Sequence, residues 1–371
     1  MADTAHGHVD GDGDGQEDGT AAPFRGIEGR TVLVTGGAGG IGSNLTRALA
    51  DLGARKVVVV DDLSSAARWN VPERPGVQFI QGSVLDEQVM RQAFLEGPSL
   101  VYHLAALFAN QNSIEHPEDD LQVNGMGTLR VLQYSKLVGT ERVVYASSGC
   151  SVYGHSPVPL VETFTSLELD TPYQITKMLG ELYCNFFKNY YGFKTVRTRF
   201  FNSFGPGELP GPYRNVIPNF ILWAMRGEPL PVMGTGEETR DWTYVDDIVD
   251  GLLRAGTMDA AVGEAFNLAS GKETRVIDMA TLVNELTGNT AGIRFIPRRR
   301  WDTKTRLLAS VDRARELVGY EPRTEFRAGL ERTVAWFRDI WDRLPDAPSR
   351  ARPAGGTNGA AHPAAHKRVT T

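Results

Sequence analysis

Short apolar segments rich in β-branched residues alternate with helical stretches over the first two thirds of the chain. Each apolar segment is nearly continuous instead of alternating with polar residues. Continuous apolar strands separated by helices are typical of a parallel sheet covered on both faces. The pattern therefore predicts a doubly wound α/β domain. The predicted strands are TVLVT (31–35), KVVVV (56–60), VQFI (77–80), LVYHL (100–104), RVVYA (142–146) and KTVRTRF (194–200), and the predicted helices end near 52 and cover about 86–94, 118–137 and 172–191.

The pattern becomes less regular beyond about residue 202. A Gly/Pro-rich connection, GPGELPGP (205–212), is followed by mixed short strands and helices and by a last amphipathic stretch, RAGLERTVAWFRDIW (327–341). We therefore expect a smaller second region whose later segments return to the sheet. Residues 1–28, rich in Asp and Gly, and residues 344–371, rich in Ala, Pro and Gly, cannot bury much apolar surface, and we expect both to be disordered.

Composition excludes several classes of partner. The 371 residues carry a net charge of -6 without a cluster of Lys and Arg, so a nucleic-acid partner is not expected. Cys150 and Cys184 lie far apart without C-x-x-C spacing, which indicates neither a disulfide framework nor a metal site. The first residues are acidic and Gly-rich without an apolar core, so we expect no signal peptide, and the sequence contains no apolar run of membrane-spanning length. We expect a cytoplasmic protein that binds a small molecule.

A glycine-rich segment, VTGGAGGIGSN (34–44), joins the first predicted strand to the first helix. Gly36, Gly39 and Gly42 would allow a tight turn and the close approach of a pyrophosphate to backbone N–H groups. The second strand ends in Asp61, about 20 residues further on, where a carboxylate can accept both ribose hydroxyls. Its negative charge repels a 2′-phosphate, and no arginine adjoins it in the sequence. The segment predicts a dinucleotide site that prefers NAD to NADP.

Tyr173 and Lys177 lie four residues apart in the predicted helix PYQITKMLGE (172–181), so both project from one face. A free tyrosine has a pKa of about 10 and is a weak base at neutral pH. A nearby ammonium and an oxidised nicotinamide would both favour the phenolate and lower that pKa. The pair is therefore a candidate acid–base catalyst.

Several further motifs follow in order and carry a family resemblance. They are HLAA (103–106), VNGMGT (123–128), SSGCSVYG (147–154), RFFNSFGP (199–206) and GTGEETRDWTYVDD (234–247). With the glycine turn and the Tyr-Lys pair, they resemble the extended short-chain dehydrogenase/reductase family over about residues 30–340, in particular its nucleotide-sugar epimerases and dehydratases. The resemblance implies a Rossmann NAD-binding domain over 29–201, a smaller C-terminal region over 202–343 that mostly binds substrate, and a homodimer paired through the Tyr-bearing helix and its neighbour.

The resemblance also implies roles for particular residues. Tyr173 would take the proton of a sugar hydroxyl while the hydride passes to NAD, Lys177 would hold the ribose, and a loop hydroxyl would bridge Tyr173 and the sugar oxygen. The implied cofactor-binding residues are Gly36, Gly39, Ile41, Gly42, Asp61, Leu104, Ala105, Ala106, Asn124, Tyr173 and Lys177. The implied partner is a nucleotide-diphosphate sugar, with a UDP-hexose favoured, held by Asn202, Arg240, Arg299 and Asp302, with Arg306 as a further candidate.

The loop SSGCSVYG holds no carboxylate. In the 4,6-dehydratases of the family an Asp and a Glu follow the loop hydroxyl, and the related decarboxylases use a loop Glu, whereas Gly149 and Cys150 stand at these positions here. The favoured reaction is therefore 4-epimerisation. The alternatives are a lyase of the same fold, a 4-ketoreductase using exchangeable NADPH, a glucuronate 4-epimerase, which Leu209 disfavours and Arg214 keeps open, and a non-catalytic NAD-binding protein.

The position of the loop hydroxyl depends on how the motif is counted. Counting forward from the strand RVVYA places it on Ser148, and counting back from VYG places it on Gly149. We predict Ser148 as the catalytic hydroxyl, with Ser151 as a reserve donor. Cys150 is interpreted as a packed thiol.

Overall fold

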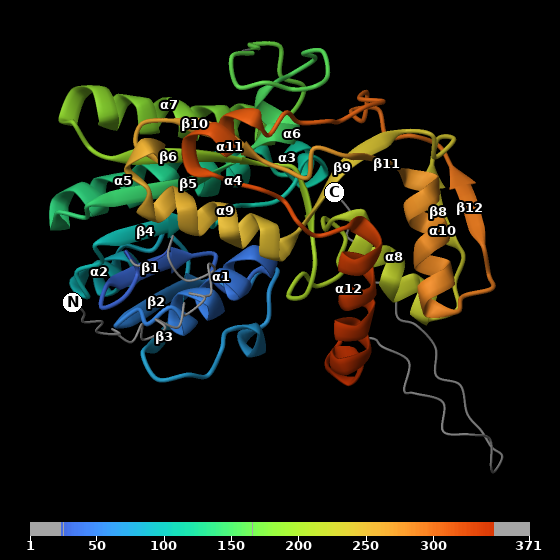
Figure 1. The fold of residues 1–371 in the computed structure, drawn as a ribbon, viewed down its shortest axis with the longest axis horizontal. Helices are drawn as coiled ribbons and strands as arrows, with labels where there is room; N and C mark the ends of the chain where they lie inside the picture. The colour runs from blue at the N-terminus through green and yellow to red at the C-terminus, as the bar shows by residue number, and fades with distance from the viewer. Residues whose placement is uncertain (1–23, 25, 165, 345–371) are drawn as a thin grey trace, which may run out of the picture.

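The computed structural model describes residue 24 and residues 26–164 and 166–344 (Figure 1). Nearly all residues of the two tails predicted to be disordered lie outside this part of the chain. Among the described residues, no helix is long and apolar enough to cross a membrane.

Seven parallel strands form the main sheet, in the order β10-β6-β5-β4-β1-β2-β3. The order reverses between β1 and β4, where the chain turns from one half of the sheet to the other. The predicted doubly wound α/β fold is confirmed. The strands are β1 (Thr31–Thr35), β2 (Lys56–Asp61), β3 (Val77–Gln81), β4 (Leu100–His103), β5 (Arg142–Ser148), β6 (Thr195–Phe200) and β10 (Ala265–Leu268).

Helices cover both faces of this sheet, which is why its strands are apolar throughout. In β2, Val57 and Val59 pack into one core and Val58 and Val60 into the other. The first core is shared with α1 (Gly40–Asp51), α9 (Val245–Thr257) and α11 (Asp312–Val318), and the second with α2 (Glu87–Leu95), α5 (Gly127–Val138) and α7 (Pro172–Tyr191). Short helical segments fill the connections: η2 (Arg68–Asn70), α3 (Asn110–Glu115), α4 (Pro117–Asp120), the π-helical η3 (Leu121–Met126), α6 (Gly149–Val152), η4 (Asp259–Ala261) and η5 (Trp341–Arg343).

A smaller region with its own core lies beside the carboxyl ends of the sheet strands (Figure 1). It contains a three-stranded sheet, a two-stranded sheet and three helices. Two elements that come late in the chain belong to the larger domain: β10 is a strand of its sheet, and α9 packs against one face of that sheet. The predicted division at residue 201 stays a prediction. The elements of the smaller region are β7 (Asn202–Phe204), α8 (Val216–Met225), β8 (Leu230–Met233), β9 (Thr239–Tyr244), β11 (Glu273–Arg275), α10 (Val276–Thr287), β12 (Ile293–Ile296) and α12 (Phe326–Ile340).

Candidate active site

A cavity of about 1090 Å³ lies between the sheet domain and the smaller region. Gly36, Asp61, Leu104 and Ser148, which end or directly follow β1, β2, β4 and β5, all line it. Ligands of doubly wound sheets bind outside the carboxyl ends of the strands, where the strand order reverses. The cavity therefore lies where the fold offers its binding site.

The glycine turn forms the wall of the cavity nearest β1. Gly36 has a φ of +71°, and a Cβ there would lie 2.7 Å from the backbone nitrogen of Ala105. A Cβ on Gly42 would lie 2.2 Å from the carbonyl oxygen of Gly36. Gly39, Gly40 and Ile41 also line the cavity, at the start of α1. The N-terminus of α1 thus presents backbone N–H groups to the cavity, and this fits the pyrophosphate of a dinucleotide.

Asp61 lies beside this turn. Its Oδ2 accepts the backbone N–H of Ala38 at 3.0 Å, and its Oδ1 accepts that of Leu63 at 2.9 Å. Burial raises the pKa of Asp61, and the two backbone hydrogen bonds act against this shift. Each carboxylate oxygen keeps a further lone pair, which fits the two hydroxyls of a ribose.

Leu104, Ala105 and Ala106 continue the cavity wall after β4. Asn124 does not line the cavity but lies behind this wall. Its amide accepts the N–H of Leu107 at 2.8 Å, donates to the Leu107 carbonyl at 3.1 Å and donates to Asp120 at 2.7 Å. Asn124 therefore braces the segment after β4, and its predicted contact with the cofactor stays a prediction.

Tyr173 and Lys177 both face the cavity from α7. The helix begins with Pro172, and its cap Thr171 accepts the N–H of Gln174 at 3.4 Å, so the first turn that carries Tyr173 is fixed. The Nζ of Lys177 donates to the carbonyl of Ala146 at 2.9 Å and lies 5.6 Å from the centre of the Tyr173 ring. The tertiary structure thus places the two side chains together beside the end of β5.

Burial dominates the acid–base properties of this pair. It raises the pKa of Tyr173, and the nearby carboxylate of Asp120 raises it further. Burial lowers the pKa of Lys177 to about 8, against the opposing effect of Asp120. The protein's own groups therefore hold Tyr173 as a neutral phenol, contrary to the expected lowering by Lys177. A further positive charge in the cavity would lower the pKa of Tyr173.

Ser148 lines the cavity and accepts a hydrogen bond from the hydroxyl of Ser151 at 2.9 Å. Gly149 cannot be replaced by a residue with a side chain, because a Cβ there would lie 2.0 Å from Cε2 of Phe201. A catalytic hydroxyl at position 149 is therefore sterically excluded. This explains why a glycine stands at the position that counting back from VYG assigned to the hydroxyl. Burial raises the pKa of the Cys150 thiol to about 11, so this side chain is a protonated thiol and not a base.

The far half of the cavity carries the predicted substrate residues. Asn202, Arg240, Arg299 and Asp302 all line it. Arg240 donates to Asp302 at 3.1 Å, and the guanidinium of Arg299 lies 5.7 Å from the centre of the Trp301 ring. Arg306, the further candidate, is not part of this wall. It is exposed and pairs with Glu273 at 2.5 Å, on the surface behind β11.

Arg214 and Glu208 also line the cavity. The sequence named Arg214 only as a residue that keeps a glucuronate substrate open, and it did not single out Glu208. Arg214 donates to the carbonyl of Ser65 at 2.6 Å and acts electrostatically on Asp61, Glu208 and Tyr173. Burial raises the pKa of Glu208 to about 7. The sequence signal for Glu208 was the Gly/Pro-rich run at 205–212, because such runs mark loops and loops carry binding residues.

The glycine turn, the Asp61 carboxylate and the Tyr-Lys pair agree with the result of a family comparison. The model of the NAD dependent epimerase/dehydratase family matches residues 32–269, more than half of the chain. The chain belongs to this family. NAD is therefore its cofactor, as the position of Asp61 predicted.

Three relatives illustrate the range of this epimerase/dehydratase family. A UDP-glucose 4-epimerase of Mycolicibacterium smegmatis is 33% identical over 83% of this chain and 98% of its own length. A UDP-N-acetyl-alpha-D-glucosaminuronate decarboxylase of Bacillus cytotoxicus is 30% identical over 84% of this chain and 98% of its own length. The solved structure of an epimerase from Methanothermobacter thermautotrophicus has a TM-score of 0.85 and 57% identity over 86% of this chain and 96% of that chain. Family membership alone thus leaves both isomerase and lyase chemistry open.

Proposed function

We propose that this protein is an NAD-dependent nucleotide-sugar 4-epimerase that inverts C4 of a UDP-linked hexose. The observation that supports this most directly is the loop 147–151, which the structure describes completely. It brings the Ser148 hydroxyl to the cavity wall that also holds Tyr173, and it contains no carboxylate. Elimination of water needs a proton shuttle at this place, whereas epimerisation needs only one acid–base group and a hydride carrier.

Tyr173 and Ser148 move the proton in this proposal. Tyr173 accepts the proton of the sugar 4-hydroxyl through Ser148 and returns it after the ketone has been reduced. Lys177 holds the cofactor ribose and stabilises the phenolate. When bound, NAD would serve as the hydride acceptor for C4, and its positive nicotinamide would lower the pKa of Tyr173. Inversion of C4 would require the 4-keto sugar to present its opposite face to the cofactor before it is reduced.

Two sets of residues would orient the cofactor and the substrate. The N-terminus of α1 and Asp61 would bind the pyrophosphate and the ribose of NAD. Arg240 and Arg299 would neutralise the diphosphate of the sugar nucleotide, since a guanidinium donates two parallel hydrogen bonds to such a group. The proposed cofactor residues are Gly36, Gly39, Ile41, Gly42, Asp61, Leu104, Ala105, Ala106, Asn124, Tyr173 and Lys177, and the proposed substrate residues are Asn202, Arg240, Arg299 and Asp302.

The test of this function is turnover without added cofactor. Purified protein is mixed separately with UDP-glucose, UDP-N-acetylglucosamine and UDP-glucuronate, and the anomeric protons are followed by NMR. A product with the galacto configuration is the expected result. A 4-keto-6-deoxy sugar or a pentose formed by loss of CO₂ would instead assign lyase chemistry.

The two serines of the loop are expected to differ in their effect on the rate. Ser148→Ala should lower kcat about 10-fold to 100-fold, the loss expected for one hydrogen bond to a developing charge. Ser151→Ala removes only the hydroxyl that donates to Ser148 and should lower kcat less than about threefold. Steady-state kinetics of both variants is the measurement. A larger loss in Ser151→Ala would assign the bridging role to Ser151.

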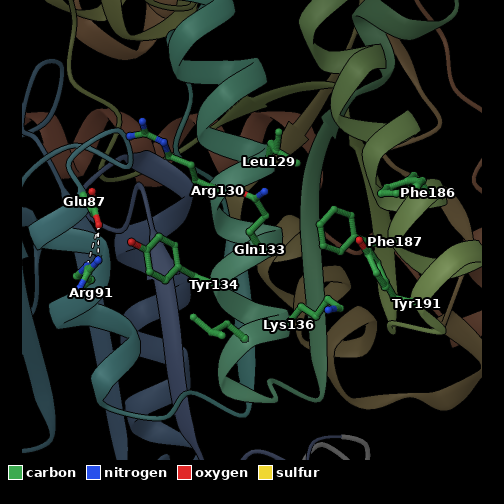
Figure 2. A pocket seen from close by; sticks show the side chains of 11 residues that line it. Glu87, Arg91, Leu129, Arg130, Gln133, Tyr134, Lys136, Phe186, Phe187 and Tyr191 are labelled. Atoms are coloured by element: carbon green, nitrogen blue, oxygen red, sulfur yellow. Dashed lines mark hydrogen bonds and ion pairs between the residues drawn. The ribbon is translucent and has the colours of Figure 1, made fainter.

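We also propose a homodimer formed through α5 and α7. Several large apolar side chains on the outer side of α7 are exposed, among them Leu182 at 55% and Phe186 at 46%. The ring of Phe186 stacks on Tyr190 at 5.5 Å, and Lys136 of α5 lies 4.3 Å from the centre of the Tyr191 ring. A hollow of about 730 Å³ lies at this face. Figure 2 shows the side chains that line it, which come from α5 and α7 together with Glu87 and Arg91 of α2. A face of this kind is typical of a protein interface.

Leu182→Glu is expected to convert the dimer into a monomer, because a charge would be buried in the apolar contact. The measurement is the mass in solution by light scattering after size-exclusion chromatography. Phe295→Glu is the matched control, since Phe295 is similarly exposed at 56% but lies on β12, on the opposite side of the molecule (Figure 1). A monomeric wild type, or a Leu182→Glu variant that remains dimeric, would contradict the proposal.

A further inference from the structure

Lys304 connects the substrate half of the cavity to the catalytic loop. It lies on the segment after β12, in the part of the chain that also contains Arg299 and Asp302. Its Nζ donates to the carbonyl oxygen of Cys150 at 2.8 Å, although the two residues are 154 positions apart in the sequence. Lys304 and Cys150 both line the cavity. The Lys304 ammonium therefore contacts the catalytic loop at Cys150, two positions after Ser148 in the sequence.

Lys304 differs from Arg240 and Arg298 in its partners, because each of these arginines forms an ion pair with a carboxylate. Arg240 pairs with Asp302 at 3.1 Å, and Arg298 pairs with Glu238 at 3.2 Å. Among the described residues, no carboxylate lies within ion-pair distance of the Lys304 Nζ, which has the neutral carbonyl of Cys150 as its hydrogen-bond acceptor. Burial lowers the pKa of Lys304 against the opposing effects of Cys150 and Asp170, and the charge of Arg240 also lowers it.

A partly buried ammonium with no carboxylate at ion-pair distance is costly, and a carboxylate placed beside it removes much of that cost. An ammonium also has three donors, so the bond to Cys150 leaves two of them for a ligand. Lys304 is thus arranged to accept a negative charge in the cavity.

The position of Lys304 indicates which part of a substrate would supply this charge. In the proposed reaction Ser148 and Tyr173 contact the oxygen on C4 of the sugar, and the neighbouring ring carbon C5 carries C6. Arg240 and Arg299 are the groups assigned to the diphosphate. A negative charge next to the catalytic loop therefore belongs to the sugar and not to the diphosphate.

We propose that the sugar carries a carboxylate at C6 and that Lys304 forms an ion pair with it, so that the substrate is a nucleotide-linked hexuronate. This inference rests on the proposed 4-epimerase function and narrows its substrate class. It departs from the argument based on Leu209, which disfavoured a uronate. The cation that binds the carboxylate comes instead from a segment nearly 100 residues later in the chain. Arg214, the other cation that kept a uronate open, donates to Ser65 beside the proposed cofactor ribose.

The test compares kcat/KM for UDP-glucuronate and UDP-glucose in the wild type and in Lys304→Met. The wild type should prefer the uronate, and the variant should lower the ratio of the two kcat/KM values about 10-fold to 100-fold, as for the loss of a charge-assisted hydrogen bond. Lys304→Arg keeps the charge and should restore part of the preference. Lys272→Met is the matched control, because Lys272 pairs with Glu325 on the exposed surface.

Three outcomes would overturn the inference. A wild type that epimerises UDP-glucose and not UDP-glucuronate excludes a hexuronate substrate while the 4-epimerase function stands. If Lys304→Met lowers kcat/KM equally for both sugars, Lys304 only supports the catalytic loop and does not bind a carboxylate. If the wild type turns over none of the sugars, the 4-epimerase function itself fails. Calorimetric Kd values for the two nucleotide sugars then decide the inference, and equal values in the wild type and in Lys304→Met would exclude it.

Discussion

Tyr173→Phe is expected to lower kcat by about 10²-fold to 10⁴-fold, the usual contribution of a general acid–base group. The phenol is the acid–base group proposed for the cavity, and burial makes its proton hard to remove without the charge of the cofactor. Phenylalanine preserves the ring, which packs edge-on against Phe108 with 5.8 Å between the ring centres. The fold and the bound NAD should therefore be unaffected, and the loss should fall on kcat.

Tyr183→Phe is the matched control for this variant, since Tyr183 lies on the same helix but packs against the sheet core and not in the cavity. The measurements are steady-state rates, the NAD content of the purified protein and its thermal unfolding. A Tyr173→Phe variant with nearly normal kcat would remove Tyr173 from the mechanism.

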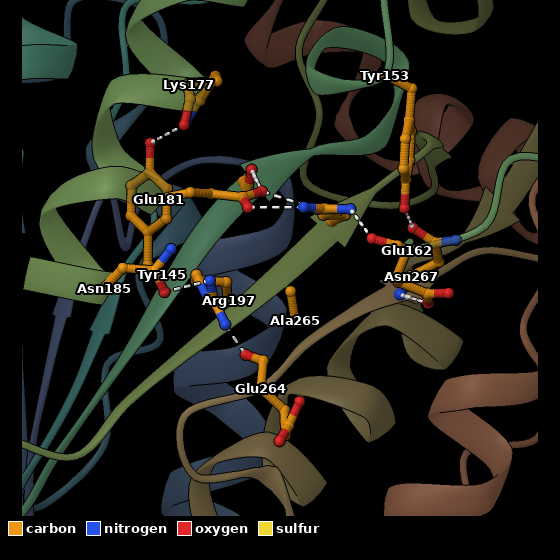
Figure 3. Close-up of polar contacts among 12 residues, drawn as sticks. Tyr145, Tyr153, Glu162, Lys177, Glu181, Asn185, Arg197, Glu264, Ala265 and Asn267 are labelled. Carbon is orange, nitrogen blue, oxygen red and sulfur yellow. Dashed lines mark hydrogen bonds and ion pairs between the residues drawn. The ribbon is translucent and has the colours of Figure 1, made fainter. Parts of the chain in front are cut away.

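Arg199→Met is expected to lower the free energy of unfolding by about 3–5 kcal/mol, the range for removing one partner of a buried ion pair. Arg199 and Glu181 form a two-pronged pair, with Nε–Oε1 and Nη2–Oε2 distances of 2.8 Å each. Their side chains are only 7% and 4% exposed. Glu181 lies on α7 and Arg199 on β6. Figure 3 shows Glu181 and, on the other side of the view, Tyr153 and Asn267. Met leaves the Glu181 carboxylate buried without its counter-charge.

The measurement is urea denaturation of the single variants and of the double variant Glu181→Leu/Arg199→Met. The double variant should recover much of the loss, because apolar side chains of similar volume can replace a buried pair. Arg327→Met is the control: Arg327 pairs with Glu285 on the surface, with both side chains more than half exposed, and should change stability by less than about 1 kcal/mol. A loss of that small size in Arg199→Met would contradict the assigned role.

This pair also connects stability to the site. Ser147, which directly precedes Ser148, donates its hydroxyl to Glu181 at 2.5 Å. Glu181 lies one helical turn after Lys177 on α7. The end of β5 and the catalytic helix are thus fixed to each other beneath the cavity. Arg199→Met should therefore also lower kcat, since Ser148 and Tyr173 would lose their fixed separation.

The sequence predicted six of the seven strands of the main sheet and the helices between them, but it did not locate β10. The continuous valines of β2 predicted a strand buried on both faces, because alternate side chains enter the two cores. The predicted helix 172–191 agrees with α7 in both bounds, since Pro172 at its start and Gly192 after its end are strong local signals. The glycine turn and Asp61 could likewise be predicted, because their roles depend on backbone geometry within one strand–turn–helix unit.

The tertiary structure alone decided the features that depend on contacts between distant segments. The ring of Phe201 excludes a side chain at Gly149 and so favours Ser148 as the catalytic hydroxyl. Arg306 lies outside the cavity, while Lys304, two residues earlier, reaches the carbonyl of Cys150. Local periodicity fixes which face of an element is buried, but the partner of an irregular loop is set by how the two regions pack. The sequence thus determined most of the sheet, its cofactor turn and the helix that carries the proposed catalytic residues, and the packing of the smaller region against the sheet determined the charges that surround the proposed sugar site.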